Sequence, residues 1–321
     1  MTQDSGGTLQ DIGEFGLIAR ITDGASLDDS AGVLVGPGDD TAVVRAPDGR
    51  VVVTCDLLVE GTHFRRDWST PIDVGRKAAA ASLADVAAMG AVPTSLVVGF
   101  GAPADLPTAW AVSCTAGIRE EAAAVGAVLV GGDVVSAPQV VISVTVLGDL
   151  EGRAPVLRSG ARTGDVLAIA GRFGWAAAGL ALLSRGFRSP KVLVDAHRFP
   201  QPPYAAGPVA ARAGATSLID VSVGLVADAR HGAEASGVVL EIDTSGWEIP
   251  EPMQAAAAAY NVDAREWMLA GGEDHALLAT FPAAGPVPEG FVVIGRVAAG
   301  EPGVTVDGVP RESPGGHRHF A

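Results

Sequence analysis

Short apolar runs alternate with helix-like stretches along the first half of the chain. The stretch LPTAWAVSCTAGIREEAAAVG (106–126) has the length and apolar spacing of a helix. The runs around it are rich in Val and Ile and predict strands: SLVVGFG (95–101), AVLVGGD (127–133) and QVVISVTVLG (139–148). Strands that alternate with a helix in this way predict one α/β unit.

The segments before this unit carry turn and cap signals. TAVVRA (41–46) and RVVVTC (50–55) flank the turn residues Pro47, Asp48 and Gly49 and predict a hairpin. Asp73 is placed to cap a helix that runs to Met89 and stops at Gly90. EFGLIARI (14–21) predicts a short helix, and residues 1–12 a mobile tail.

The second half repeats the alternation of strand and helix. Its predicted strands are VLAIAG, VVLEID (238–243), HALLATF (275–281) and FVVIGRV (291–297), with a helix over 174–185. The polar, turn-rich segment 151–165 is the best boundary between domains. The predicted organisation is a tail (1–13), a domain over 14–150 and a domain over 151–321, in the α/β (α+β) class.

Charge and composition narrow the range of partners. The chain has 48% hydrophobic and 18% charged residues and a net charge of −15, which argues against disorder, nucleic-acid binding and anionic membranes. No apolar stretch is long enough for a membrane span, and the N-terminus lacks a secretory signal. Two cysteines without close spacing favour free thiols in a reducing compartment, so we expect a cytoplasmic protein.

Asp85 is the most informative single residue. On the predicted helix it shares a face with alanines, and Leu83, Ala84, Val86 and Ala87 surround it in the sequence. A carboxylate on such a face is costly to bury unless a cation meets it. The alternative is that this face is only partly buried and that Asp85 is solvated.

Three more carboxylates stand at predicted strand ends. GPGDD (36–40) precedes a strand and presents Asp40, TCD (54–56) ends the next strand with Asp56, and Asp133 follows AVLV in a glycine turn. Together with Asp85 they predict an oxygen-rich cluster suited to Mg²⁺. Each of them taken singly is also an ordinary turn residue.

Other chemistries lack their motifs. The chain has no GxxxxGK[ST] loop, no GxGxxG fingerprint and no GxSxG elbow, and its only lysines are Lys77 and Lys191. His63 follows Asp56 closely and is a candidate ligand contact, with a surface loop histidine as an equal alternative. In LIDVSVGLVAD (218–228), Asp220 and Ser222 share one face of a strand that ends at Gly224.

A family resemblance joins these motifs. The segments EFGLIARI, GPGDDTAVV, TCDLLVEGTHF, SLADVAAMGA, LVGGD, LRSGARTGD, IDVSVGL and AGGEDHALL resemble, in order and approximate spacing, those of thiamine-monophosphate kinase. That family belongs to the superfamily of aminoimidazole ribonucleotide synthetase. The resemblance implies the two-domain fold of that superfamily, with an N-terminal ATP- and Mg²⁺-binding domain that dimerises through its sheet. The C-terminal domain would complete the active-site cleft.

The resemblance also implies an activity and a set of site residues. The activity is ATP-dependent phosphorylation of thiamine monophosphate, assisted by several Mg²⁺ ions and without a general base. The implied metal ligands are Asp40, Thr54, Cys55 (through its backbone carbonyl), Asp56, Asp85, Asp133 and Asp220. The implied ATP contacts are Gly132, Asp133, Arg158 and Ser222, and the implied substrate contacts are His63, Glu273 and His317.

Two positions depart from the family pattern. Val223 stands where the family has an aspartate that binds Mg²⁺, and His317 stands where an aromatic residue is expected. Val223 leaves a second interpretation open, in which the chain binds nucleotide or thiamine phosphates with little or no turnover. A third is another ATP-using member of the superfamily. Against two of these members, no cysteine precedes Cys55 and the chain does not end in a cysteine.

Overall fold

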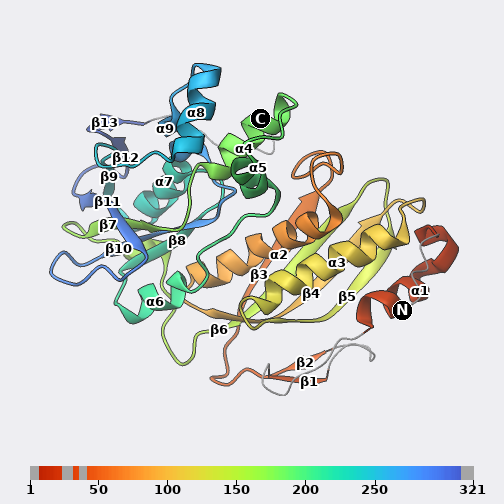
Figure 1. The fold of residues 1–321 in the computed structure, drawn as a ribbon. Helices are drawn as coiled ribbons and strands as arrows, with labels where there is room; N and C mark the ends of the chain where they lie inside the picture. The colour runs from red at the N-terminus through yellow and green to blue at the C-terminus, as the bar shows by residue number, and fades with distance from the viewer. Residues whose placement is uncertain (1–6, 24–31, 36–41, 312–321) are drawn as a thin grey trace. The chain divides into compact units, whose positions relative to one another are not determined.

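The computed structural model describes residues 7–23, 32–35 and 42–311. By its internal contacts the chain divides into two compact units. The first unit comprises Met1–Val86 with Val92–Gly152, and the second comprises Ala87–Ala91 with Arg153–Ala321. Each unit has its own sheet and its own helices, which Figure 1 labels.

The first unit is built on a four-stranded sheet with the order β3-β6-β4-β5. Its strands are β3 (Val52–Val59), β4 (Val92–Ala102), β5 (Val128–Ser136) and β6 (Val141–Asp149). Its helices are α1 (Leu9–Thr22), α2 (Pro71–Ala88) and α3 (Thr108–Ala123). Strands β1 (Val33–Val35) and β2 (Val43–Val44) form a separate two-stranded sheet.

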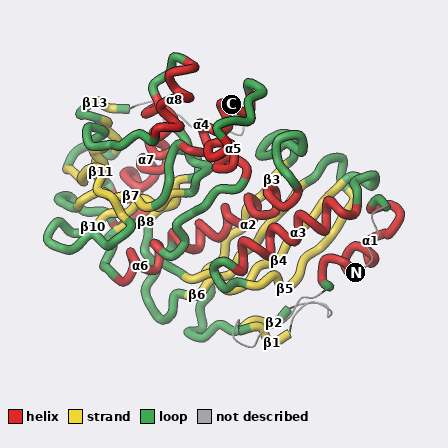
Figure 2. Tube along the Cα trace, in the orientation of Figure 1, coloured by secondary structure: helices red, strands yellow, loops and turns green. Residues whose placement is uncertain are grey.

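Helices α2 and α3 lie side by side over the four-stranded sheet (Figures 1 and 2). Two glycines let their backbones touch. A β-carbon at Gly75 of α2 would overlap the carbonyl oxygen of Cys114, and one at Gly117 of α3 would overlap that of Ile72. Such contacts fix α2 against α3, because helix backbones approach this closely only where side chains are absent.

The predicted hairpin is wrong. Strand β2 pairs with β1, whereas β3 pairs along its whole length with β6, from Val52 opposite Gly148 to Val59 opposite Val141. The eight-residue ladder with β6 and the packing of β3 under α2 outweigh the local turn signal at Pro47–Gly49. Asp56 therefore lies in the middle of β3 and not at a strand end.

The second unit is built on a seven-stranded sheet with the order β13-β12-β9-β11-β7-β10-β8. The strands are β7 (Val166–Ala170), β8 (Ser217–Val221), β9 (Val239–Ile242), β10 (Ala276–Phe281), β11 (Phe291–Ala298), β12 (Gly303–Val306) and β13 (Val309–Pro310). The helices are α4 (Trp175–Ser184), α5 (Lys191–Arg198), α6 (Ala206–Arg212), α7 (Leu225–Ser236), α8 (Glu251–Tyr260) and α9 (Ala264–Ala270), with a short 3₁₀ turn η2 (Arg158–Gly160).

Both faces of this sheet are covered, so its central strands are apolar on both sides. Leu167 and Ile169 of β7 pack in one core cluster with α7, and Ala168 and Ala170 pack in the other. All five residues of β8 are buried, and Asp220 near its end is only 8% exposed. A carboxylate in such a strand requires partners, which directs attention to what surrounds it.

The helix predictions are confirmed, with shifted starts. Helix α1 already begins at Leu9, where Thr8 and Asp11 form a capping box, so residues 9–12 are not tail. At the start of α2, Thr70 and Asp73 exchange backbone and side-chain hydrogen bonds, so the cap is Thr70 and Asp73 is its partner. Among the described residues no helix has the length and apolarity to cross a membrane.

Candidate functional site

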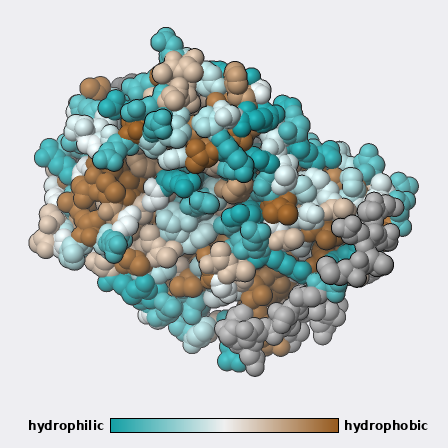
Figure 3. Space-filling model, in the orientation of Figure 1, coloured by the Kyte–Doolittle hydropathy of each residue, from teal (hydrophilic) through white to brown (hydrophobic). Residues whose placement is uncertain are grey.

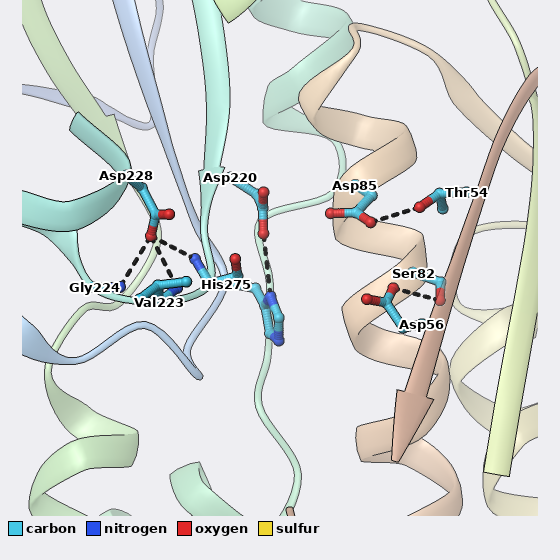
Figure 4. A network of polar contacts seen from close by, with 10 residues as sticks. Thr54, Asp56, Ser82, Asp85, Asp220, Val223, Gly224, Asp228 and His275 are labelled. Atoms are coloured by element: carbon cyan, nitrogen blue, oxygen red, sulfur yellow. Dashed lines mark hydrogen bonds and ion pairs between the residues drawn. The ribbon is translucent and has the colours of Figure 1, made fainter. Parts of the chain in front are cut away.

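Two carboxylates of the first unit are held by hydroxyl groups between β3 and α2. Thr54 Oγ1 donates to Asp85 Oδ2 at 2.7 Å, and Ser82 Oγ donates to Asp56 Oδ2 at 2.7 Å (Figure 4). Thr54 and Asp56 are two residues apart on β3 and therefore lie on the same strand face, and Ser82 and Asp85 are three residues apart on one face of α2. The four side chains therefore meet between the strand and the helix. Each carboxylate still presents oxygen atoms to a ligand. Carboxylate oxygens are the ligand type that Mg²⁺ prefers.

The side chain of Cys55 lies on the opposite face of β3. Its side chain is exposed, with Sγ 3.3 Å from Ser143 Oγ of the neighbouring strand β6. The expected metal contact of Cys55 involves its backbone carbonyl and remains a prediction. Cys114 is buried in α3, and burial raises the pKa of its thiol. Both cysteines are free thiols, as expected.

Asp133 is not at a strand end. β5 runs on to Ser136, and Asp133 lies opposite Gly99 of β4. The register shifts by one residue where Leu96 faces Leu129 and Val97 faces Gly131, so β5 bulges and continues instead of turning at the glycines. A β-carbon at Gly132 would overlap the carbonyl oxygen of Val98, which gives Gly132 a packing role beside its expected ATP contact.

His63 is fixed in a tight loop after β3. Its Nδ1 accepts a hydrogen bond from the backbone N–H of Val59 at 3.0 Å, and its carbonyl oxygen accepts one from Nζ of the buried Lys77 at 3.0 Å. Because Nδ1 accepts, the proton of a neutral ring is on Nε2. The ring therefore offers an N–H donor, which is suited to a phosphate oxygen.

In the second unit, the end of β8 and the following turn form a polar centre. Nδ1 of His275 lies 3.4 Å from Asp220 Oδ2. The backbone N–H groups of Ser222, Val223 and Gly224 all donate to one oxygen of Asp228, each at 2.9 Å (Figure 4). Burial, reinforced by the charge of Asp220, raises the pKa of Asp228 to about 6. The turn that carries Ser222 is thus held by a carboxylate of α7.

The segment Glu273–His275 contacts three different elements through consecutive side chains. Oε2 of Glu273 lies 2.9 Å from Nδ1 of His197 on α5. Asp274 accepts from the backbone N–H of Ala176 at the start of α4, and His275 meets Asp220 at the end of β8. The segment predicted to touch substrate is therefore also a structural junction of the second unit.

Arg158 lies in the exposed turn η2, and its carbonyl oxygen accepts a hydrogen bond from Ser236 Oγ at 2.9 Å. Asp40 and His317 lie outside the described residues. Within the described residues no three or more His, Cys, Asp or Glu side chains gather closely enough to form a metal cluster. The metal set implied by the resemblance is drawn from both units and from Asp40, and it remains a prediction.

The second unit also contains an open cavity of 1270 Å³. Phe173, Trp175 and Trp247 supply its aromatic lining, with Phe173 and Trp247 packed edge to face at 5.2 Å between ring centroids. None of the described residues that the sequence predicted for the site lines it. On the face drawn in Figure 3, apolar groups reach the surface in several separate areas.

Four supporting residues escaped the sequence analysis. Ser82 lies three residues before Asp85, Asp228 four residues after Gly224, and Asp274 directly after Glu273, so each had a local signal. The spacing of Asp228 puts its side chain over the first turn of α7, where backbone N–H groups need acceptors. His197 carries no such signal, because its partner Glu273 is far away in the sequence.

Asp274 predicts a pH dependence of stability. It is 4% exposed, and burial raises its pKa from 3.8 to about 6 in the folded chain. A carboxyl group with a raised folded-state pKa binds its proton more tightly when folded. Its contribution to stability is therefore greatest below pH 3.8 and is lost as the pH rises through about 6.

We therefore expect the stability of Asp274→Asn relative to the wild type to rise between about pH 4 and pH 7. The amide cannot ionise, and its oxygen can still accept from Ala176. The two pKa units correspond to at most roughly 3 kcal/mol. Melting temperatures of both proteins over this pH range measure the difference. Two parallel profiles would show that Asp274 is not ionising in a buried site.

Comparison with known proteins extends the likeness over more than nine tenths of the chain. Residues 38–150 match the family described as AIR synthase related protein, N-terminal domain. The thiamine-monophosphate kinase of Mycobacterium tuberculosis is 53% identical over 302 residues, which cover 94% of this chain and 90% of that protein. The thiamine-monophosphate kinase of Corynebacterium glutamicum is 42% identical, with 91% and 88% covered.

A solved structure of AaThiL complexed with AMPPCP and TMP is similar in fold, with a TM-score of 0.80 and 33% identity. The match covers 98% of this chain and 99% of that chain. This likeness confirms the mixed α/β, two-unit fold of the aminoimidazole ribonucleotide synthetase type that the motifs predicted.

Proposed function

Because the chain belongs to the thiamine-monophosphate kinase family, we propose that it transfers the γ-phosphoryl group of ATP to the phosphate of thiamine monophosphate. The product is thiamine diphosphate, so the reaction is the last step in making that compound. The observation that carries the proposal is 53% identity over 94% of the chain. The likeness to AaThiL, whose complex holds AMPPCP and TMP, supports the same pair of substrates.

The polar groups of the site suit phosphoryl transfer. The acceptor is a phosphate oxygen that is largely ionised at neutral pH, since the second pKa of a phosphate monoester is about 6, so no general base is required. His63, whose Nδ1 accepts from the backbone N–H of Val59, is proposed to contact the phosphate of thiamine monophosphate. Glu273 supplies negative charge for the cationic thiazolium ring.

The donor set fits Mg²⁺. Asp56 and Asp85 present carboxylate oxygens that Ser82 and Thr54 orient, and Asp220 presents another at the end of β8. We propose that these residues, with Asp40, Thr54, the Cys55 carbonyl and Asp133, hold several Mg²⁺ ions. Bound Mg²⁺ supplies charge neutralisation on the phosphates. Gly132, Asp133, Arg158 and Ser222 are proposed for ATP, and His63, Glu273 and His317 for thiamine monophosphate.

The proposal is tested by a coupled assay of ADP release with three rival acceptors: thiamine monophosphate, thiamine and an aminoimidazole ribonucleotide precursor. We expect ADP release with thiamine monophosphate and Mg²⁺ only. Release with the aminoimidazole precursor would move the chain to another branch of the superfamily. ADP release at the background level with all three acceptors would exclude the proposed kinase activity.

Val223 is the one observation that favours a second candidate, a relative that binds these ligands with little turnover. The backbone N–H of Val223 donates to Asp228, so the turn keeps its shape without the missing carboxylate. We expect the wild type to be active and Val223→Asp to lower the Mg²⁺ concentration for half-maximal rate about tenfold. An inactive wild type that Val223→Asp rescues would support the second candidate.

We also propose that the protein is a homodimer that forms through the sheet of the first unit. On β3 the side chains of Val53 and Leu57, 61% and 52% exposed, alternate with Thr54 and Asp56 and lie on the opposite strand face. Val135 on β5 is 58% exposed. Apolar side chains in such a strand pattern are typical of an interface.

Leu57→Glu is therefore expected to give a monomer in sedimentation velocity, because a carboxylate at an apolar interface has no partner. Val292→Glu is the matched control, since Val292 is 66% exposed on β11 of the second unit. A dimer that survives Leu57→Glu would exclude this face.

We further propose that the protein works in the cytoplasm.

A further inference from the structure

Helix α7 contacts both segments of the second unit that carry residues proposed for ATP. In its first turn, Asp228 accepts three backbone hydrogen bonds from the turn that contains Ser222. Its last residue, Ser236, contacts the turn η2, whose first residue is Arg158. A single helix of 12 residues therefore connects the two segments.

The hydroxyl group of Ser236 makes two hydrogen bonds to the backbone around η2. Its Oγ donates to the carbonyl oxygen of Arg158 at 2.9 Å and accepts from the backbone N–H of Ala161 at 3.2 Å. A hydroxyl has one proton to donate and lone pairs to accept with, so both bonds can form together. Because Arg158 begins η2 and Ala161 directly follows it, this one side chain spans the whole turn.

The backbone of η2 is also held by the segment at the start of β8. A β-carbon at Gly160 would overlap the carbonyl oxygen of Thr216, so the two backbones touch. The backbone N–H of Leu218 donates to the carbonyl oxygen of Leu157 at 3.3 Å. The turn is therefore fixed by two elements, β8 and the end of α7.

The side chain of Arg158, by contrast, is available to a ligand. The residue is exposed, and within the described part of the chain its guanidinium group makes no hydrogen bond or ion pair. A guanidinium group is permanently charged and has five N–H donors, which suit the oxygens of a phosphate. A fixed backbone that carries a charged group without a partner is the arrangement expected of a preformed anion contact.

We propose that Ser236 is a positioning residue for ATP, which holds η2 on the end of α7 and so keeps Arg158 at a set distance from the Ser222 turn. The inference rests on the proposed function and on the roles of Arg158 and Ser222 in it. Preorganised groups bind their ligand more tightly because the ordering cost is met during folding. The effect should fall on ATP and leave thiamine monophosphate unaffected, because Ser236 bonds only to the segment that carries Arg158.

Removal of the hydroxyl group tests the inference. We expect Ser236→Ala to raise KM for ATP, and Kd for AMPPCP with Mg²⁺ measured by calorimetry, about fivefold. KM for thiamine monophosphate should change less than about twofold. Ser236→Thr keeps the hydroxyl group and should restore both ATP constants to within about twofold of the wild type. Ser184→Ala is the matched control with wild-type constants, because Ser184 Oγ donates only to the carbonyl oxygen of Leu180 within α4.

Three outcomes would overturn the inference: a wild-type Kd for AMPPCP in Ser236→Ala, equal increases in Ser236→Ala and Ser236→Thr, or KM for thiamine monophosphate rising together with KM for ATP. A double-mutant cycle with Arg158→Ala is the second test. Ser236→Ala should add little to Arg158→Ala, since the positioned group is gone, and full additivity would contradict the positioning role. Failure of the proposed function is seen separately, as an absence of product in the wild type, because AMPPCP binding is measured without turnover.

Discussion

Asp85→Asn is expected to lower kcat by about a hundredfold to a thousandfold while the protein stays folded. The amide oxygen can still accept from Thr54 Oγ1, so the contact between α2 and β3 is kept. What is lost is the negative charge proposed to bind Mg²⁺. Steady-state rates over a range of Mg²⁺ concentrations measure the effect, and high Mg²⁺ should recover part of the rate.

The matched control is Asp48→Asn. Asp48 pairs with Arg50 near the turn before β3, and its replacement changes the net charge by the same amount. Wild-type kcat and an unchanged Mg²⁺ dependence in Asp85→Asn would remove Asp85 from the metal site.

Asp228→Ala is expected to lose about 2 kcal/mol of stability, because three backbone N–H groups, of which that of Gly224 is buried, lose their shared acceptor. The turn that carries Ser222 would loosen, so KM for ATP should rise as well. Asp228→Asn keeps an acceptor oxygen and should lose much less. Denaturant unfolding and ATP kinetics measure the two effects.

For this variant the informative comparison is between Ala and Asn. The pKa of Asp228 is raised to about 6 by burial, so a neutral acceptor avoids part of the cost of the buried charge. If Asp228→Ala has the same stability as the wild type, the three hydrogen bonds do not hold the turn. If Ala and Asn are equally damaging, the charge matters and the acceptor does not.

Local sequence patterns predicted most of the elements that carry the site. Strand β6 and helix α3 follow from apolar periodicity, because each buries one regular face. The failures concern long-range pairing. The turn at Pro47–Gly49 is real, but the partner of β3 is β6, some ninety residues away, and no local signal specifies that choice.

The site shows the same division. Asp85 and Asp220 stand out because a carboxylate in an apolar pattern is unusual. The predicted position of Asp133 at a strand end was wrong, because the two glycines before it indicated a turn where the bulged strand β5 continues. The close approach of His197 to Glu273 could not be found, because it depends on α5 packing against α4 at Gly179. The family resemblance, confirmed at 53% identity, supplied roles that residue patterns alone did not.

Phosphorus NMR of the complete reaction distinguishes phosphoryl transfer to thiamine monophosphate from hydrolysis of ATP. With ATP, Mg²⁺ and thiamine monophosphate, we expect the two coupled resonances of thiamine diphosphate to grow in equal amount with ADP. Both should be abolished by EDTA or by omission of thiamine monophosphate. Unchanged thiamine monophosphate, with ATP either intact or hydrolysed to ADP and inorganic phosphate, would contradict the proposed transfer.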